Sequence, residues 1–82
     1  MRALFVGGPV DNSELDLEPG DPPQNYPDKR SGAPHAHASY RLHHTGPRGK
    51  RASYAVYAAR EMADDDVERI CDERDYERRF AA

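Results

Sequence analysis

The sequence predicts a small α+β domain, in which an antiparallel sheet of about four strands in two hairpins carries one C-terminal helix packed on it. Residues 3 to 59 contain short apolar or alternating segments separated by glycine, proline and asparagine, which is typical of strands joined by turns. After residue 63 the apolar residues recur at helical spacing instead. With 82 residues, the chain makes one domain at most.

The first hairpin is predicted from two short segments near the N-terminus. Residues 3 to 6 form a continuous apolar run, which indicates a strand covered on both faces, and the glycines and proline at 7 to 9 end it. Residues 13 to 18 alternate polar and apolar side chains, so Leu15 and Leu17 lie on one face of a second strand. Turn-forming residues between the two segments predict that the strands pair with each other.

The second hairpin is predicted on either side of a basic connection. Residues 19 to 36 contain five of the seven prolines, which favours a long, mobile loop. In residues 37 to 44 and 52 to 59, successive side chains are predicted to alternate between the two faces of a strand, and the glycine-containing segment 45 to 51 joins these two strands. In the first of these strands, one face is predicted to carry Ala38, Tyr40 and Leu42, and the other His37, Ser39, Arg41 and His43. In the second strand, Tyr54 and Val56 are predicted on one face, and Ala55 and Tyr57 on the other.

A helix is predicted to begin at the three aspartates of residues 64 to 66. Asp65 and Glu68 match the spacing of a capping box, and acids at the start with arginines near the end suit the helix dipole. The face predicted to pack on the sheet consists of Val67, Ile70 and Cys71.

The end of this helix is predicted to change character. Arg74 and Arg78 continue the packed face, so the apolar stripe fades after Cys71. Tyr76 and Phe80, four residues apart, project from roughly the opposite side of a continued helix. We interpret them either as a frayed end or as a second contact patch.

The composition predicts a sparse core. Leu, Ile, Val and Phe together number 11 of 82 residues, a proportion low enough for parts of the chain to be disordered. The net charge of −3 argues against full disorder, because it is too small for self-repulsion to expand the chain. We therefore expect a compact part with mobile segments, completed by a partner or by a second copy.

Cysteine usage and the N-terminus bear on the compartment. A single cysteine, Cys71, excludes an intramolecular disulfide and a multi-cysteine zinc site, which suits a reducing cytosol. The apolar run of residues 3 to 6 is too short for a signal peptide or a membrane span. We expect a soluble, cytoplasmic protein that does not bind membranes.

The glycine pair at Gly7 and Gly8 resembles a phosphate-binding loop only superficially. A Walker loop needs Lys and Ser or Thr after its second glycine, and a dinucleotide loop needs three spaced glycines that open a helix. Here Pro9 and then several acids follow, and these acids would repel an anion. We interpret the pair as a structural turn, and we predict no bound cofactor.

The histidines give only weak support for a metal site. His35, His37 and His43 would share a strand face if the third strand began early, and imidazoles at this spacing can bind zinc, copper or nickel. Residues 29 to 60 contain no carboxylate or cysteine that could add a ligand. An exposed polar strand face is the favoured interpretation, with adventitious metal capture as the alternative, so no metal site is predicted.

No catalytic residue is predicted either. Catalysis needs a nucleophile beside a base, or paired carboxylates in a dry pocket. Ser39 with His37, or Ser53 with His43, can be aligned only on paper, because a small sheet with one helix leaves little volume for a cleft. A thiol on a buried helix face, as predicted for Cys71, is usually inert.

Charge is strongly segregated along the chain. Residues 11 to 28 carry six acids and no base, residues 29 to 60 carry seven bases and no acid, and residues 61 to 82 carry nine acids and four arginines. The basic tip at residues 48 to 51 is narrow enough to enter a nucleic-acid groove, and strand tyrosines could stack on bases. Because such tyrosines are more often core and the acidic ends oppose a polyanion, charge compensation within the chain is favoured.

Several short motifs resemble a group of small accessory proteins encoded by tailed bacteriophages and prophages of actinobacteria and other high-GC hosts. The motifs are Phe5-Val6-Gly7-Gly8-Pro9-x-Asp11, Tyr40-Arg41, Tyr54-Ala55-Val56-Tyr57 and Asp65-Asp66-Val67. Asn12 stands where the family usually has glycine, and asparagine can adopt the same left-handed turn. Most members have no assigned activity, and the resemblance supplies no catalytic residue.

The resemblance implies a non-enzymatic protein that binds a host protein in the cytoplasm of the infected bacterium, as a takeover or counter-defence factor. Two other functions stay open: a nucleic-acid-binding module that uses the basic hairpin, and a minor self-assembling component of a virion. The candidate interaction surface comprises Arg48, Lys50, Arg51, Asp65, Glu68, Asp72, Tyr76 and Phe80.

Overall fold

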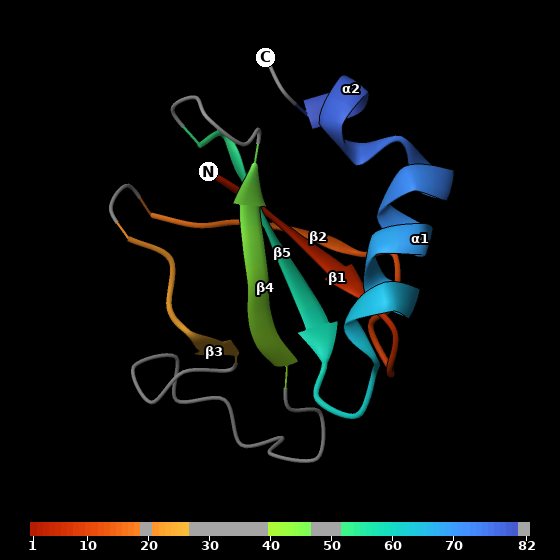
Figure 1. Ribbon diagram of the computed structural model, residues 1–82. Helices are drawn as coiled ribbons and strands as arrows, with labels where there is room; N and C mark the ends of the chain where they lie inside the picture. Colours follow the sequence, from red (N-terminus) through yellow and green to blue (C-terminus); the bar gives the residue numbers. More distant parts are fainter. Residues whose placement is uncertain (19–20, 27–39, 47–51, 81–82) are drawn as a thin grey trace.

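The computed structural model describes residues 1–18, 21–26, 40–46 and 52–80, and its fold is a curled five-stranded sheet with two helices (Figure 1). This agrees with the small α+β domain that the sequence predicts. The elements are β1 (Arg2–Val6), β2 (Glu14–Asp16), β3 (Asn25–Tyr26), β4 (Tyr40–Gly46), β5 (Tyr54–Ala59), α1 (Asp64–Arg74) and α2 (Tyr76–Phe80).

The strands lie in the order β2-β1-β5-β4-β3. Both predicted hairpins are present, since β1 pairs antiparallel with β2 and β4 pairs antiparallel with β5. The prediction of a wholly antiparallel sheet is wrong, because β1 and β5 lie side by side and run parallel. Both strands are apolar on both faces, and residues 3–6 and 54–59 are buried, which explains their place at the centre.

The fifth strand lies inside the segment predicted to be a loop. Asn25 and Tyr26 form β3 and pair with Arg41 and Tyr40 of β4, while the Tyr57 hydroxyl donates a hydrogen bond of 2.7 Å to the Pro23 carbonyl. The prolines therefore did not exclude a short edge strand, where few backbone N–H groups need a partner. The rest of the predicted loop, residues 19–20 and 27–36, and residues 37–39 of the predicted third strand lie outside the described residues.

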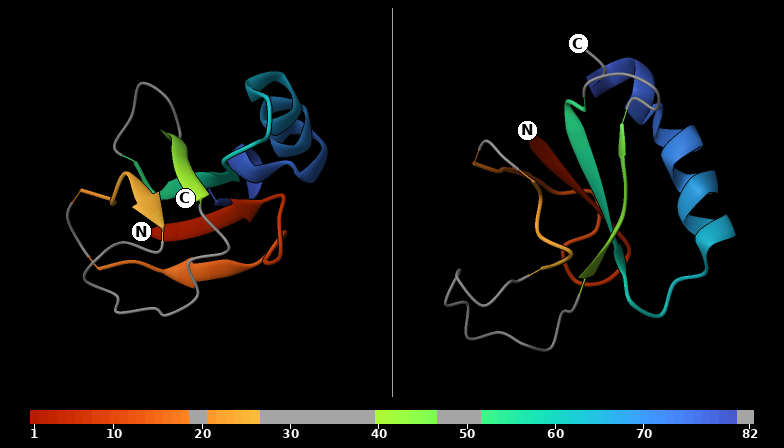
Figure 2. Two further views of the ribbon diagram at one scale, coloured as in Figure 1. Left: turned by 90° about the horizontal axis from the view of Figure 1, so that it is seen from below. Right: turned by 60° about the vertical axis from the view of Figure 1, so that its left-hand side comes forward.

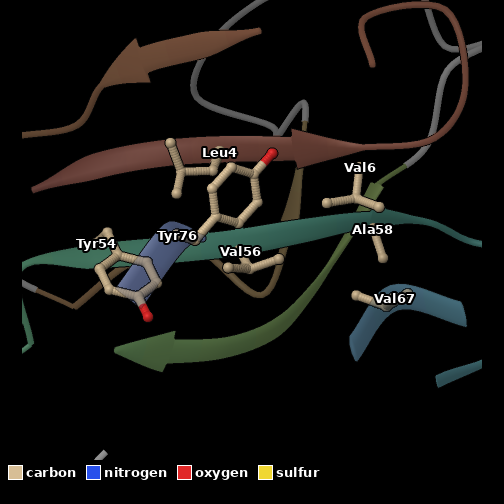
Figure 3. Packing of buried hydrophobic residues seen from close by; sticks show 7 residues of the cluster. All are labelled: Leu4, Val6, Tyr54, Val56, Ala58, Val67 and Tyr76. Carbon is tan, nitrogen blue, oxygen red and sulfur yellow. The ribbon is translucent and has the colours of Figure 1, made fainter. Parts of the chain in front are cut away.

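Apolar side chains cover the sheet on both faces. The layer beneath the helices consists of Leu4, Val6, Tyr54, Val56, Ala58, Val67 and Tyr76 (Figure 3). The layer on the opposite face is aromatic at its centre, where the Phe5 ring centroid lies 5.1 Å from that of Tyr40 and 5.6 Å from that of Tyr57. Tyr26 of β3 packs against this cluster, on the face of the sheet opposite the two described helices.

Helix α1 begins at Asp64, with Ala63 as its N-cap, and no side chain caps it. The predicted capping box on Asp65 and Glu68 is wrong because the helix starts one residue before Asp65, which places Asp65 in the first turn. Val67 is buried, as predicted. The acidic first turn and the basic last turn are also confirmed.

The chain does not continue as one straight helix. Asp75 adopts a left-handed conformation, with φ of 57°, and its N–H closes the last turn of α1. Helix α2 then leaves in a new direction on the same side of the sheet (Figures 1 and 2). Tyr76 is 3% exposed and packs beside Leu4, so the prediction that it projects from the far side is wrong. Neither described helix has the length and apolar composition needed to cross a membrane.

Candidate functional site

The glycine turn between β1 and β2 binds a carboxylate of its own chain. Gly7 and Gly8 both have positive φ, and the Gly7 N–H donates a hydrogen bond of 2.7 Å to Oδ1 of Asp11. The backbone donor that a phosphate would need is therefore already used, and the carboxylate adds negative charge at that point. This supports the interpretation of the glycine pair as a structural turn.

Asn12 completes this turn in the conformation expected for it, with φ of 66°. Phe5 accepts a hydrogen bond from the Asn12 N–H and donates one to the Ser13 carbonyl, so two residues on one strand oppose one residue on the other. Such a bulge normally has glycine at its left-handed position. Asparagine tolerates the same conformation better than other side chains do.

Two distant residues fix the turn to the rest of the molecule. The Tyr40 hydroxyl donates to the Gly7 carbonyl at 2.6 Å and accepts from the Val10 N–H at 3.1 Å. Nη2 of Arg74, at the end of α1, lies 2.9 Å from each carboxylate oxygen of Asp11. We refer to Gly7, Gly8, Val10, Asp11, Asn12, Tyr40 and Arg74 as the turn network.

The charges in the turn network stabilise each other. Partial burial alone would raise the pKa of the Asp11 carboxyl, but the Gly7 N–H and the Arg74 guanidinium outweigh it and lower the pKa. Burial would likewise lower the pKa of Arg74, whereas its bonds to Tyr76 and Asp11 raise it. The Asp11 carboxylate, the Tyr40 hydroxyl and the Arg74 guanidinium all bind groups of their own chain, so we interpret the network as structural.

His43 does not lie on the exposed polar face that the sequence predicts for it together with His35 and His37. The His43 side chain is 8% exposed, and its Nε2 lies 3.4 Å from Oδ1 of Asp64, the same oxygen that Arg41 contacts at 2.9 Å. His43 Nδ1 also lies 2.7 Å from Nδ1 of His44. His43 lies on the same strand face as Arg41, as the alternation predicts, and the start of α1 at Asp64 covers this face.

Metal binding finds no support in the part of the chain that the structure describes. Within residues 1–18, 21–26, 40–46 and 52–80, no three His, Cys, Asp or Glu side chains lie close enough together to hold a metal ion. Two of the histidines considered for a metal site, His35 and His37, lie outside these ranges.

An open cavity of about 320 Å³ lies between the two helices and the β4–β5 hairpin. Its lining combines carboxylate side chains with two tyrosines. We call it the acidic groove, and the residues that line it are His44, Tyr54, Glu68, Cys71, Asp72, Tyr76 and Glu77. The groove contains three of the residues predicted for an interaction surface: Glu68, Asp72 and Tyr76.

The acids around the groove differ from those on the neighbouring side of α1. Asp66 and Glu73 lie within 3.5 Å and 3.3 Å of the Arg69 guanidinium. Asp72 and Glu77, in contrast, make no ion pair with any residue in the described ranges. Two unpaired carboxylates at one cavity produce a local negative potential, which favours a cationic ligand.

Cys71 also lines the acidic groove, next to Asp72 in the sequence. Burial raises the pKa of its thiol to about 11, and the negative charges of Asp72 and Glu68 add to the effect. Little thiolate exists at neutral pH, so Cys71 is a weak nucleophile, consistent with the inert thiol that the sequence predicts.

The remaining predicted surface residues are not brought together. Asp65 is exposed in the first turn of α1, away from the groove lining. Phe80 packs its ring against Tyr54 and Tyr76, with centroids 6.4 Å and 5.9 Å apart, and so supports the core. The three basic residues of the predicted hairpin tip lie outside the described ranges: Arg48, Lys50 and Arg51.

The sequence did not indicate two lining residues, His44 and Glu77. His44 was hidden by the register shift in β4, and Glu77 by the change of direction at Asp75. The strand tyrosines considered for base stacking, Tyr40, Tyr54 and Tyr57, are all buried. Comparison with protein-family models, curated proteins and solved structures finds no match to this chain.

Proposed function

We propose that this chain is a non-enzymatic binding protein whose acidic groove receives a basic segment of another protein. The observation that carries the proposal is Asp72. It lies in the last turn of α1, where the helix dipole disfavours negative charge, and no described cation compensates it. A residue that costs stability where it stands is typical of a binding site.

The shape and lining of the groove support the same function. Glu68, Asp72 and Glu77 surround a cavity whose lining also includes the largely buried Tyr54 and Tyr76. Carboxylates attract a lysine or arginine side chain, and an aromatic ring can contact its aliphatic stem and its charge. The cavity is large enough for one such side chain together with part of its backbone.

The motif resemblance suggests the biological setting. A phage accessory protein of this size would act in the cytoplasm of the infected bacterium by occupying the surface of a host protein, as a takeover or counter-defence factor. The negative charge of the acidic groove would complement a positively charged surface on the host protein.

Binding to arginine-containing peptides tests the groove directly. We expect a panel of capped eight-residue peptides with two or three arginines to bind the wild type, and Asp72→Asn/Glu77→Gln to lower the affinity about tenfold. The matched control is Asp66→Asn/Glu73→Gln, which removes the same two charges from α1 outside the groove. Equal losses in both variants, or no peptide binding at all, would overturn the proposal.

Affinity capture from a bacterial host lysate tests the setting. The wild type should retain a host protein that Asp72→Lys/Glu77→Lys does not retain and that the control variant does. Tyr76→Ala is unsuitable here because it removes a core ring and would unfold the chain. Capture of the same proteins by all three forms would reject a role for the groove in host binding.

A further inference from the structure

Strand β2 forms one outer edge of the sheet, and within the described residues only β1 pairs with it. The hydrogen bonds of this pair fall on alternate residues: the Leu17 N–H donates to the Met1 carbonyl, and the Phe5 N–H donates to the Ser13 carbonyl. Ala3 and Leu15 are the hydrogen-bonded pair between them. The backbone N–H and C=O groups of Glu14 and Asp16 therefore point away from the sheet.

The side chains of this edge have a defined pattern. Glu14 and Asp16 lie on one face, where Arg2 contacts them at 3.6 Å and 3.2 Å. Two carboxylates share one guanidinium, so this face keeps a negative charge. Leu15 lies on the other face, and with Val10 of the same hairpin it is one of the two exposed large apolar side chains among the described residues.

This pattern disfavours a second copy of the chain as the occupant. Two β2 strands paired antiparallel about Leu15 would place Glu14 of each copy opposite Asp16 of the other. Like charges directly opposite each other destabilise a strand pair. A strand with lysine or arginine on either side of an apolar residue would instead place a cation beside each carboxylate.

We propose that the outer edge of β2 receives an extended segment of a partner protein that reads basic–apolar–basic. The apolar residue contacts Leu15, the basic residues contact Glu14 and Asp16, and the outward-facing backbone groups of Glu14 and Asp16 complete the new strand pair. On its inner side, β2 already shows part of this pattern, because Arg2 lies opposite Asp16 and Ala3 opposite Leu15, whereas Leu4 lies opposite Glu14.

Hydrogen exchange with a model peptide tests this proposal. The probe is a capped peptide in which lysine and valine alternate, and the control probe has glutamate in place of lysine. The lysine peptide should slow amide exchange at Glu14 and Asp16, whose N–H groups have no backbone partner among the described residues, and the glutamate peptide should not. Protection by both peptides, or by neither, would overturn the proposal.

Variants separate this edge from the acidic groove. Glu14→Gln/Asp16→Asn should weaken the lysine peptide about tenfold, whereas Asp72→Asn/Glu77→Gln should change its affinity by less than about twofold. Glu14→Gln/Asp16→Pro removes the same two charges together with the outward-facing N–H of residue 16, and it should weaken the lysine peptide further. If the groove variant weakens the lysine peptide as much as the edge variant does, the peptide binds in the groove. If Glu14 and Asp16 become protected when the chain self-associates without peptide, the edge pairs with a second copy. Either result would overturn the proposal.

Discussion

Two regions of the molecule have carboxylates near the end of α1, and they differ in whether a cation of the same chain pairs with the carboxylate. In the turn network, Asp11 accepts a hydrogen bond from Gly7 and two from Arg74. In the acidic groove, Asp72 makes no ion pair with any described residue, although it stands only two positions before Arg74. Proximity along the helix therefore does not decide which acid is compensated. The direction of each side chain does.

The comparison separates stability from binding. Carboxylates whose partners lie within the chain contribute to folding, and their loss should lower stability. Carboxylates left to solvent at a cavity contribute nothing to folding, and their loss should change ligand affinity while stability stays the same or rises. The following predictions test this division from the largest expected change in stability to the smallest.

Gly8→Ala should be the most damaging of these changes. An alanine with φ near +68° is strained, and its Cβ would lie 2.6 Å from the Tyr40 hydroxyl, which would have to move and release Gly7 and Val10. We expect a loss of about 2–4 kcal/mol in the free energy of unfolding, measured by urea titration. Asn12→Gly is the control, because it keeps the left-handed conformation and should stay within about 0.5 kcal/mol. A neutral Gly8→Ala would show that the turn network can rearrange.

Arg74→Gln and Asp11→Asn should each cost about 1 kcal/mol, because both side chains are partly exposed. The double variant should cost less than the sum, since the two groups bind each other. Arg69→Gln is the matched control: its partners are more exposed and it should change stability by about 0.3 kcal/mol or less. Additive losses at Arg74 and Asp11 would mean that their contact contributes nothing.

The pH dependence of stability should also depend on Asp11. Its pKa is lowered in the folded state, so its contribution is complete above the pKa of the unfolded chain, about 4, and is lost as pH falls through the folded value. The stability difference between wild type and Asp11→Asn should therefore be constant from pH 7 to about 5 and shrink below about pH 4. A difference that does not change with pH would show that Asp11 acts through packing rather than charge.

Much of the fold was predictable because it depends on local sequence. The apolar run of residues 3 to 6, the alternating segments and the turn residues predicted both hairpins, and the period-3.6 pattern predicted the buried face of α1. The parallel pairing of β1 with β5 was not predictable in this way, because no local signal says which strands of two hairpins meet. Strand β3 has only two residues among prolines, too short for any periodicity to show.

The candidate site was predictable only in part. Glu68 and Asp72 follow from helical spacing, because residues three and four apart share a face. Tyr76 was misplaced because a left-handed residue at Asp75 redirects the chain, and aspartate carries no strong sequence signal for such a break. Gly7 and Gly8 were correctly interpreted as a turn, but the bonds from Tyr40 and Arg74 are long-range contacts that a sequence does not reveal.

The smallest expected effect has the opposite sign. Asp72→Asn should raise the free energy of unfolding by up to about 0.5 kcal/mol, because it removes a negative charge from the last turn of α1. Asp66→Asn should lower it by a similar amount, since Asp66 lies in the first turn and contacts Arg69. Urea titrations of both variants at low salt would measure the two changes side by side. If Asp72→Asn instead destabilises the chain, then Asp72 has a stabilising role like that of Asp11, and it no longer supports a binding function for the groove.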